Sequence, residues 1–132
     1  IGLDTNVLVR YIVQDDPEQS GQASAFMEKN CTKEDPGFVT LIVLIELVWV
    51  LKIAYQYDKK TIQNVLQQLL ITTELHIEQT NNVWRALYEF KKGTADFADY
   101  LIAAINREHN CDMTVTFDRK ASKINHFYLL SD

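Results

Sequence analysis

The stretch GFVTLIVLIELVWVL, residues 37–51, decides the fold class, because it joins a short apolar strand to an apolar helix through a threonine. GFVT is typical of a short buried strand, and the side chain of Thr40 can cap a helix that we expect from Leu41 to about Tyr55. This helix is apolar on nearly every face, so we expect it to be central. A strand that leads directly into a helix is the repeating unit of α/β proteins.

The same alternation continues on both sides of this stretch. Upstream, we expect a strand at residues 1–4, clipped so that the natural chain has at least one more residue, and a helix from Asp16 and Pro17 to about Asn30. Downstream, we expect helices beginning at Asp58, covering Val83 to Phe90 and running from after Gly93 to about Asn110, strands at 74–78, 113–117 and 126–130, and a helical turn at 118–123. This alternation implies right-handed crossovers and a mainly parallel sheet with helices on both faces.

Length and composition limit the class of protein. A chain of 132 residues, 47% of them hydrophobic and with no repeat or linker, is expected to form one domain over residues 1–132. The net charge of −5 argues against bulk electrostatic coating of nucleic acid, so a polyanion must be met locally. The most apolar stretch is shorter than the roughly 20 residues that span a bilayer, and no secretory signal precedes it, so we expect a soluble, cytoplasmic protein. Cys31 and Cys111 lack metal-ligand spacing and are expected to be reduced.

Four acids stand out, and two of them lie where parallel-sheet proteins bind ligands. Asp4 and Asp118 each directly follow an expected apolar strand, at the carboxyl end where ligands bind. Glu46 lies inside the apolar helix, where a buried carboxylate without a partner would cost several kcal/mol. Asp99 follows Asp96 by three residues at the start of another apolar helix, where the helix dipole favours carboxylates.

Each acid also has a purely structural explanation. Asp4 and Asp118 can be helix N-caps, and Asp96 can cap its helix with Asp99 at the third position. Glu46 can be protonated, or paired with a buried lysine or arginine. Their joint occurrence, without a histidine or cysteine ligand set, favours instead one oxygen-only site suited to Mg²⁺ or Mn²⁺. Such ions activate water and neutralise phosphoryl oxygens, so phosphodiester hydrolysis is the reaction class that this set predicts.

The segments LDTNVLVRY, VLIELVWVL, ADFADYLIAA and TVTFDRKA, in that order and spacing, resemble the PIN-domain ribonucleases, and more closely the VapC-type toxins. The resemblance covers nearly the whole chain and implies a three-layer α/β/α PIN-like fold with a mainly parallel central sheet flanked by helices. It implies that the chain hydrolyses RNA with Mg²⁺ or Mn²⁺ held by Asp4, Glu46, Asp99 and Asp118. It also implies an antitoxin that covers the active cleft, and a homodimer.

Three further residues are expected beside these acids. By the same resemblance, Asn6 matches the polar position that orients the first acid, and Thr116 matches the hydroxyl or small residue beside the last. A helix cap and an ordinary strand threonine are the alternatives for these two. Asp96 is either a further site residue or the cap of its helix.

Basic and aromatic residues near the acids have two interpretations each. A set of lysines and arginines flanks the third and fourth acids and forms either a phosphate-contacting rim or a solvated surface: Lys91, Lys92, Arg107, Arg119, Lys120 and Lys123. Trp49 either lines the cleft or, as is commoner, packs in the core. The histidines show no ligand spacing and receive no role.

Three other functions compete with a ribonuclease. An aspartate-nucleophile phosphatase usually has a second acid two positions after the first, where this chain has Asn6. A metal-free PIN-like scaffold that binds RNA or protein without cleavage would be signalled by the loss of one or more acids, and all four are present. A metal-dependent deoxyribonuclease shares the chemistry, and only contacts to the 2′-hydroxyl separate the two substrates.

Overall fold

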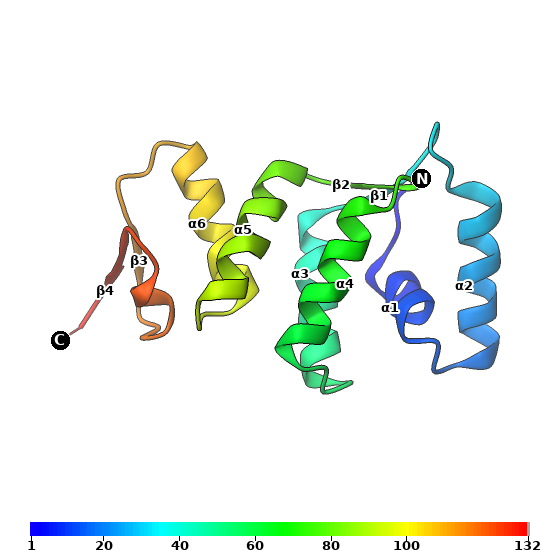
Figure 1. Cartoon of the computed structure of the whole chain (residues 1–132), viewed down its shortest axis with the longest axis horizontal. Helices are drawn as coiled ribbons and strands as arrows, with labels where there is room; N and C mark the ends of the chain where they lie inside the picture. The colour runs from blue at the N-terminus through cyan, green and yellow to red at the C-terminus, as the bar shows by residue number, and fades with distance from the viewer. Residues whose placement is uncertain (132) are drawn as a thin grey trace. The chain divides into compact units, whose positions relative to one another are not determined.

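The computed structural model describes residues 1–131 and divides into two compact units, which we describe separately. The first unit is Ile1–Thr80, and the second begins at Asn81. Figure 1 shows the helices and strands of both units along the chain. None of the helices within residues 1–131 combines the length and the apolar character needed to cross a membrane.

The first unit packs four helices with one pair of strands. Its elements are α1 (Thr5–Val13), α2 (Pro17–Asn30), β1 (Gly37–Val39), α3 (Leu41–Ile53), α4 (Lys59–Ile71) and β2 (Leu75–Ile77). β1 and β2 are parallel, with Gly37 opposite Leu75, and α1 contacts both α2 and α3 (Figure 1). The core is built mainly from fully buried aliphatic side chains, among them Leu8, Val39, Leu44, Leu47, Leu51 and Leu66.

Local capping explains where these helices begin. The hydroxyl of Thr40 accepts a hydrogen bond from the N–H of Val43 at 3.1 Å and so caps α3, as predicted. The carboxylate of Asp16 accepts the N–H groups of Glu18 and Gln19, with Pro17 in the first turn of α2. The predicted starts of both helices are therefore confirmed, while α3 ends at Ile53, before the predicted end.

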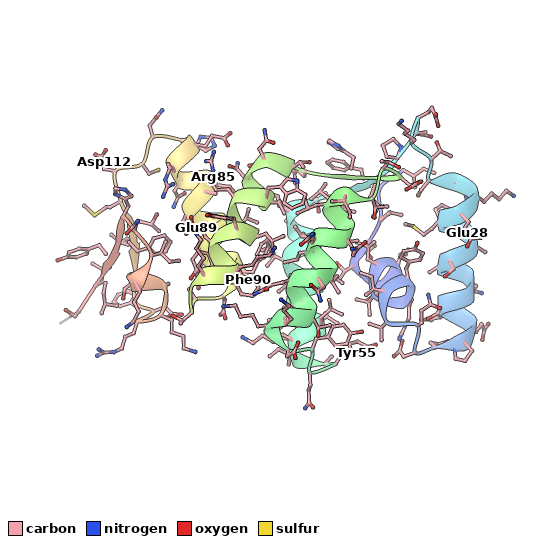
Figure 2. All side chains as sticks on the ribbon, viewed as in Figure 1. Glu28, Tyr55, Arg85, Glu89, Phe90 and Asp112 are labelled. Atoms are coloured by element: carbon pink, nitrogen blue, oxygen red, sulfur yellow. The ribbon has the colours of Figure 1, made fainter. Side chains whose placement is uncertain are left out.

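A polar cluster ties the end of α1 to the segment after α3. The guanidinium of Arg10 donates to Asp15 at 2.9 Å and to the hydroxyl of Tyr55 at 3.3 Å, and that hydroxyl donates to Asp15 at 2.8 Å. Tyr55 lies just after the last turn of α3 (Figure 2). The hydrogen bond from Tyr55, together with Arg10, lowers the pKa of Asp15 below its usual value of 3.8.

The strand predicted at residues 1–4 is present only as a single parallel bridge between Gly2 and Phe38. Two backbone hydrogen bonds accompany it, from Leu3 N–H to the Phe38 carbonyl at 3.0 Å and from Phe38 N–H to the Ile1 carbonyl at 2.7 Å. Asp4 is already the N-cap of α1, so the chain leaves the extended conformation before a longer ladder can form. The predicted strand is therefore wrong in length, although its parallel direction is confirmed.

Burial on α3 also differs from the prediction. One side of the helix is buried through Leu44, Leu47 and Leu51, whereas Trp49 is 63% exposed. The prediction that α3 is central therefore holds for one side of the helix only, and the alternative that Trp49 packs in the core is wrong. The physical reason is that α1 and α4, which contact α3, cover only part of its circumference.

The second unit contains two helices and a second pair of parallel strands. Its elements are α5 (Thr80–Lys92), α6 (Phe97–Glu108), β3 (Thr114–Thr116), a 3-10 turn η1 (Ala121–Lys123) and β4 (Phe127–Leu129), with Thr114 opposite Phe127. Helices α5 and α6 meet where the ring of Phe90, labelled in Figure 2, packs against Phe97 and Tyr100. Both described strand pairs are thus parallel, as predicted.

Helix α6 begins at Phe97, after Gly93 as predicted. The intervening loop folds against Tyr100, whose hydroxyl accepts the N–H of Ala95 at 3.3 Å. A Cβ atom at Gly93 would overlap that hydroxyl, so the loop needs a glycine there to pass this close. The loop leaves Asp96 at the N-cap position and Asp99 in the first turn.

Candidate active site

In the first unit, a single threonine links two of the predicted acids. The N–H of Thr5 donates to the carboxylate of Asp4 at 2.8 Å, and the hydroxyl of Thr5 donates to Oε1 of Glu46 at 3.1 Å. Asp4 is the N-cap of α1, while Glu46 lies in the second turn of α3, so Thr5 joins the start of one helix to the other. Two carboxylates from distant parts of the sequence are therefore held on either side of one residue.

Glu46 is exposed and not buried, which corrects the reason for singling it out. Its neighbours on that side of α3, Ile42 and Trp49, are exposed as well, at 74% and 63%. Water can hydrate the carboxylate there, so no buried cation is needed to compensate it. The prediction that Glu46 is buried is wrong, whereas its role as a ligand stays a prediction.

Thr5 is the residue that the sequence analysis missed. It is only 7% exposed, and it shares the buried face of α1 with Leu8 and Val9, three and four residues later. That spacing was visible in the sequence, but the partner of the hydroxyl lies 41 positions away. A hydroxyl on the buried face, directly after a strand-terminal acid, was the available signal.

Asp4 and Asn6 share the rim of one hollow. This hollow, about 570 Å³, lies between the start of the chain and α2 and is lined also by Arg10 and Phe26. Both Asp4 and Asn6 are exposed. Asp4 bonds only the first N–H of α1 and not the second or third that an N-cap usually satisfies, so capping accounts for part of its position.

In the second unit, the negative charges of two neighbouring carboxylates act on Asp99. Partial burial, and then the negative charges of Asp96 and Asp118, raise the pKa of Asp99 above its usual value of 3.8. Asp96 stands at the N-cap position of α6 without making a cap hydrogen bond through its side chain, so the predicted cap role describes its position only. The three acids together create a negative potential that favours a cation.

Hydrogen bonds to residues before and after it hold Asp118 in place. Its own N–H donates to the hydroxyl of Thr116 at 3.0 Å, and its carboxylate accepts the N–H groups of Lys120 and Ala121 at 2.8 and 3.2 Å. The carboxylate thus supports the turn that leads into η1, as the cap alternative expected. Thr116 lies directly beside this acid, which is the arrangement that the resemblance implied.

The predicted quartet is divided evenly, with Asp4 and Glu46 in the first unit and Asp99 and Asp118 in the second. Among residues 1–131, no group of three or more histidine, cysteine, aspartate or glutamate side chains is assembled as a metal site. The donor chemistry nevertheless fits a hard divalent cation, because every candidate ligand is a carboxylate and Asp99 lies in an uncompensated negative field.

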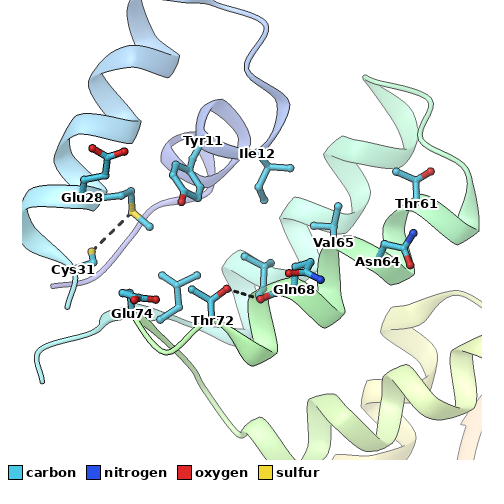
Figure 3. Close-up of a pocket in the computed structure, with 13 residues that line it drawn as sticks. Tyr11, Ile12, Glu28, Cys31, Thr61, Asn64, Val65, Gln68, Thr72 and Glu74 are labelled. Atoms are coloured by element: carbon cyan, nitrogen blue, oxygen red, sulfur yellow. Dashed lines mark hydrogen bonds between the residues drawn. The ribbon is translucent and has the colours of Figure 1, made fainter. Parts of the chain in front are cut away.

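A larger hollow lies away from the predicted site. It has a volume of about 810 Å³, contains none of the four acids, and is bordered by residues of α1, α2, α4 and β2 (Figure 3). Tyr11 and Val65 lie on opposite sides of it, and the thiol of Cys31 approaches Met27 Sδ at 3.9 Å. Cys31 and Cys111 are both free thiols, as predicted.

The sequence matches a known family over almost its full length. The model of the PIN domain family matches residues 1–126. The chain belongs to the PIN domain family. This membership confirms the predicted fold class, a three-layer α/β/α PIN-like fold, and agrees with the parallel strands of both units.

One curated relative of this PIN domain protein is a VapC ribonuclease from Aquifex aeolicus (strain VF5). The two sequences are 25% identical over 122 residues, which is 92% of this chain and 90% of the relative. The resemblance seen in the sequence is thereby confirmed.

Proposed function

We propose that this PIN domain protein is an endoribonuclease that hydrolyses RNA phosphodiester bonds with Mg²⁺ or Mn²⁺. The family match over residues 1–126 and the likeness to a VapC ribonuclease support the nuclease class. The structural observation that supports the metal dependence is the gathering of carboxylates around Asp99, whose pKa is raised first by partial burial and then by the charges of Asp96 and Asp118.

Threonine hydroxyls position two of the proposed metal ligands. Asp4, Glu46, Asp99 and Asp118 would hold the metal, with Asp96 beside them. The hydroxyl of Thr5 restricts the position of the Glu46 carboxylate, and the hydroxyl of Thr116 holds the backbone of Asp118. When bound, a divalent cation supplies stabilisation of the negative charge that develops on the phosphate during hydrolysis.

The decisive experiment is a cleavage assay with purified protein. Single-stranded RNA, structured RNA and DNA of the same sequence are incubated with EDTA, and then with Mg²⁺ or Mn²⁺ restored. We expect RNA cleavage only with metal. Full cleavage after exhaustive chelation would contradict the metal dependence, preferential cleavage of DNA would favour the deoxyribonuclease, and RNA binding without cleavage would favour the metal-free scaffold.

We further propose that the protein is the toxin of a toxin–antitoxin pair. The support is the likeness to a protein named VapC ribonuclease. Expression without a partner should arrest growth, and expression of the Asp99→Asn variant at the same level should not. Normal growth with confirmed wild-type nuclease activity would contradict the toxin role. The antitoxin partner, the homodimer and the cytoplasmic location stay predictions.

A further inference from the structure

A basic hollow lies within the second unit, between α5, α6 and the end of η1. It has a volume of about 320 Å³, and four cationic side chains line it: Arg85 and Lys92 from α5, Arg107 from α6, and Lys123 from η1. Arg85 and Lys92 are seven residues apart, two turns along the same face of α5. Glu89, one turn after Arg85 in Figure 2, is the sole acid among the lining residues that the structure describes.

The charge of this hollow is opposite to that of the whole chain. The chain has a net charge of −5, yet four of the seven lysines and arginines of residues 81–131 line this single hollow. Lys92 lies 3.9 Å from the centre of the Tyr88 ring. In the described part of the chain, no carboxylate forms a salt bridge with Arg85, Arg107 or Lys123. Because Glu89 is the sole acid beside these four cations in the lining, an anion that binds among them lowers their mutual repulsion.

The basic hollow continues into a second one. This neighbour, about 280 Å³, shares Ala103, Arg107 and Asn125 with it and extends along the starts of β3 and β4, where one acid, Asp112, also lines it. Arg107 therefore stands between the two. The two hollows together form a track with a cation, Arg107, in its middle. Such a track suits a chain of phosphates better than a single small anion.

Arg107, in the middle of the track, lies on the same helix as the proposed metal ligand Asp99 but at a distance from that ligand. Arg107 is eight residues after Asp99 on α6, which places it about 12 Å further along the helix axis. Of the six basic residues flagged in the sequence, Lys92, Arg107 and Lys123 line the basic hollow, while Lys91, Arg119 and Lys120 do not. Arg85 also lines the basic hollow, because α5 packs against α6. No local sequence pattern predicts that packing.

We propose that Arg85, Lys92, Arg107 and Lys123 form a groove that binds backbone phosphates of an RNA strand outside the cleaved bond. This proposal rests on the proposed ribonuclease function. The groove holds the strand by charge, and so it contributes to affinity without reading the base sequence.

Binding is measured without cleavage, by fluorescence anisotropy of a labelled single-stranded RNA in EDTA at several salt concentrations. The Arg107→Gln/Lys123→Gln protein should bind at least about tenfold more weakly at moderate salt, because two phosphate contacts are lost. The slope of log affinity against log salt should become shallower by about 1.4, since each contact to single-stranded RNA contributes about 0.7. Wild-type affinity and slope in this variant would overturn the proposal.

A matched control separates the groove from net charge alone. Lys33→Gln/Lys60→Gln removes the same charge from exposed positions of the first unit and should change affinity by less than about twofold. An equal loss of affinity in this control would overturn the groove. Glu89→Gln tests the opposite direction, because removal of the acid that lines the groove should tighten RNA binding, and unchanged or weaker binding would count against it.

These results are separable from those on the proposed function. If the wild-type protein fails to cleave RNA with Mg²⁺ but the groove variants lose binding, the ribonuclease is wrong and the groove stands. If the wild type cleaves RNA and the groove variants bind RNA normally, the ribonuclease function stands and the groove is wrong. Melting temperatures of the variants, expected to equal or exceed that of the wild type, verify that the fold is intact.

Discussion

At the scale of single residues, the buried hydroxyl of Thr5 donates a hydrogen bond to the exposed carboxylate of Glu46. Asp4, Asp99 and Asp118 were identified because acids at strand ends and helix starts follow local rules. Thr5 was missed because its contact with Glu46 spans 41 positions. Glu46 was singled out on the argument that it is buried, and that argument failed because exposure depends on which neighbours cover α3.

Thr5→Val tests the link between α1 and Glu46. The change keeps the shape of a side chain that is 7% exposed but removes its hydroxyl, so the Glu46 carboxylate loses its donor. We expect the rate of RNA cleavage to fall about 10- to 100-fold, the usual effect of removing a group that orients a metal ligand. Thr5→Ser keeps the hydroxyl and should retain most of the activity. Equal activity of both variants would show that this hydrogen bond does not matter for cleavage.

Asp99→Asn tests the crowding of acids in the second unit. The raised pKa of Asp99 means that the folded protein binds this proton more tightly than the unfolded chain, so its contribution to stability is present in acid and falls as pH rises through the folded pKa. Without metal, the stability of the Asn variant should not fall in this way, and the variant should be no less stable than wild type at pH 7. With Mg²⁺ present, its rate of RNA cleavage should be at least about tenfold lower.

The controls are Asp4→Asn and Asp96→Asn. Asp4→Asn should also lose cleavage, whereas Asp96→Asn should be milder, because asparagine suits the N-cap position of α6. Melting temperature against pH, together with cleavage rate, is measured for all three variants. Wild-type cleavage by both Asp4→Asn and Asp99→Asn would reduce these acids to structural roles.

At the scale of elements, local signals predicted the helices better than the strands. Caps at Asp16 and Thr40 fixed the starts of α2 and α3 because they act within three residues. The first strand is reduced to one bridge, and the loop before α6 packs on Tyr100. These two outcomes depend on contacts between elements, which neither propensity nor periodicity contains.

Tyr55→Phe tests the cluster that joins α1 to the segment after α3. The variant removes the hydroxyl that donates to Asp15, so the melting temperature at pH 7 should fall. Because the cluster lowers the pKa of Asp15 in the folded state, its contribution is present above the unfolded pKa, near 3.8, and is lost as pH falls through the folded pKa.

The difference in melting temperature between Tyr55→Phe and wild type should therefore narrow as pH falls below about 3.8. Tyr57→Phe removes a neighbouring hydroxyl outside the cluster and serves as the control. A difference that stays constant down to pH 2 would show that the ionised Asp15 is not involved.

At the scale of the whole molecule, we propose that residues 1–132 act as one nuclease domain in which all four acids hold the metal. A ligand that binds only the folded state raises the free energy of unfolding of every part that it joins. Mg²⁺ should therefore slow amide hydrogen exchange in both cores alike, around Leu44 and Leu47 of α3 and around Leu101 and Ala104 of α6.

Exchange measured by mass spectrometry with and without Mg²⁺ tests this prediction. The protein with both Asp4→Asn and Asp99→Asn serves as the control and should show no protection by metal. Protection of α6 without protection of α3 would contradict a metal held by all four acids.

The uneven charge of the chain has a kinetic consequence. Residues 81–132 hold as many basic as acidic side chains, so the net charge of −5 belongs to residues 1–80. In dilute salt, where the Debye length is about 30 Å, an approaching RNA meets this repulsion before it reaches the short-range attraction of the basic groove. The association rate constant should therefore rise with added salt. The affinity should nevertheless fall, because the dissociation rate constant should rise by a larger factor. Stopped-flow measurements in EDTA can resolve the two rates, and an association rate that falls with salt would instead indicate that the strand is steered by attraction from afar.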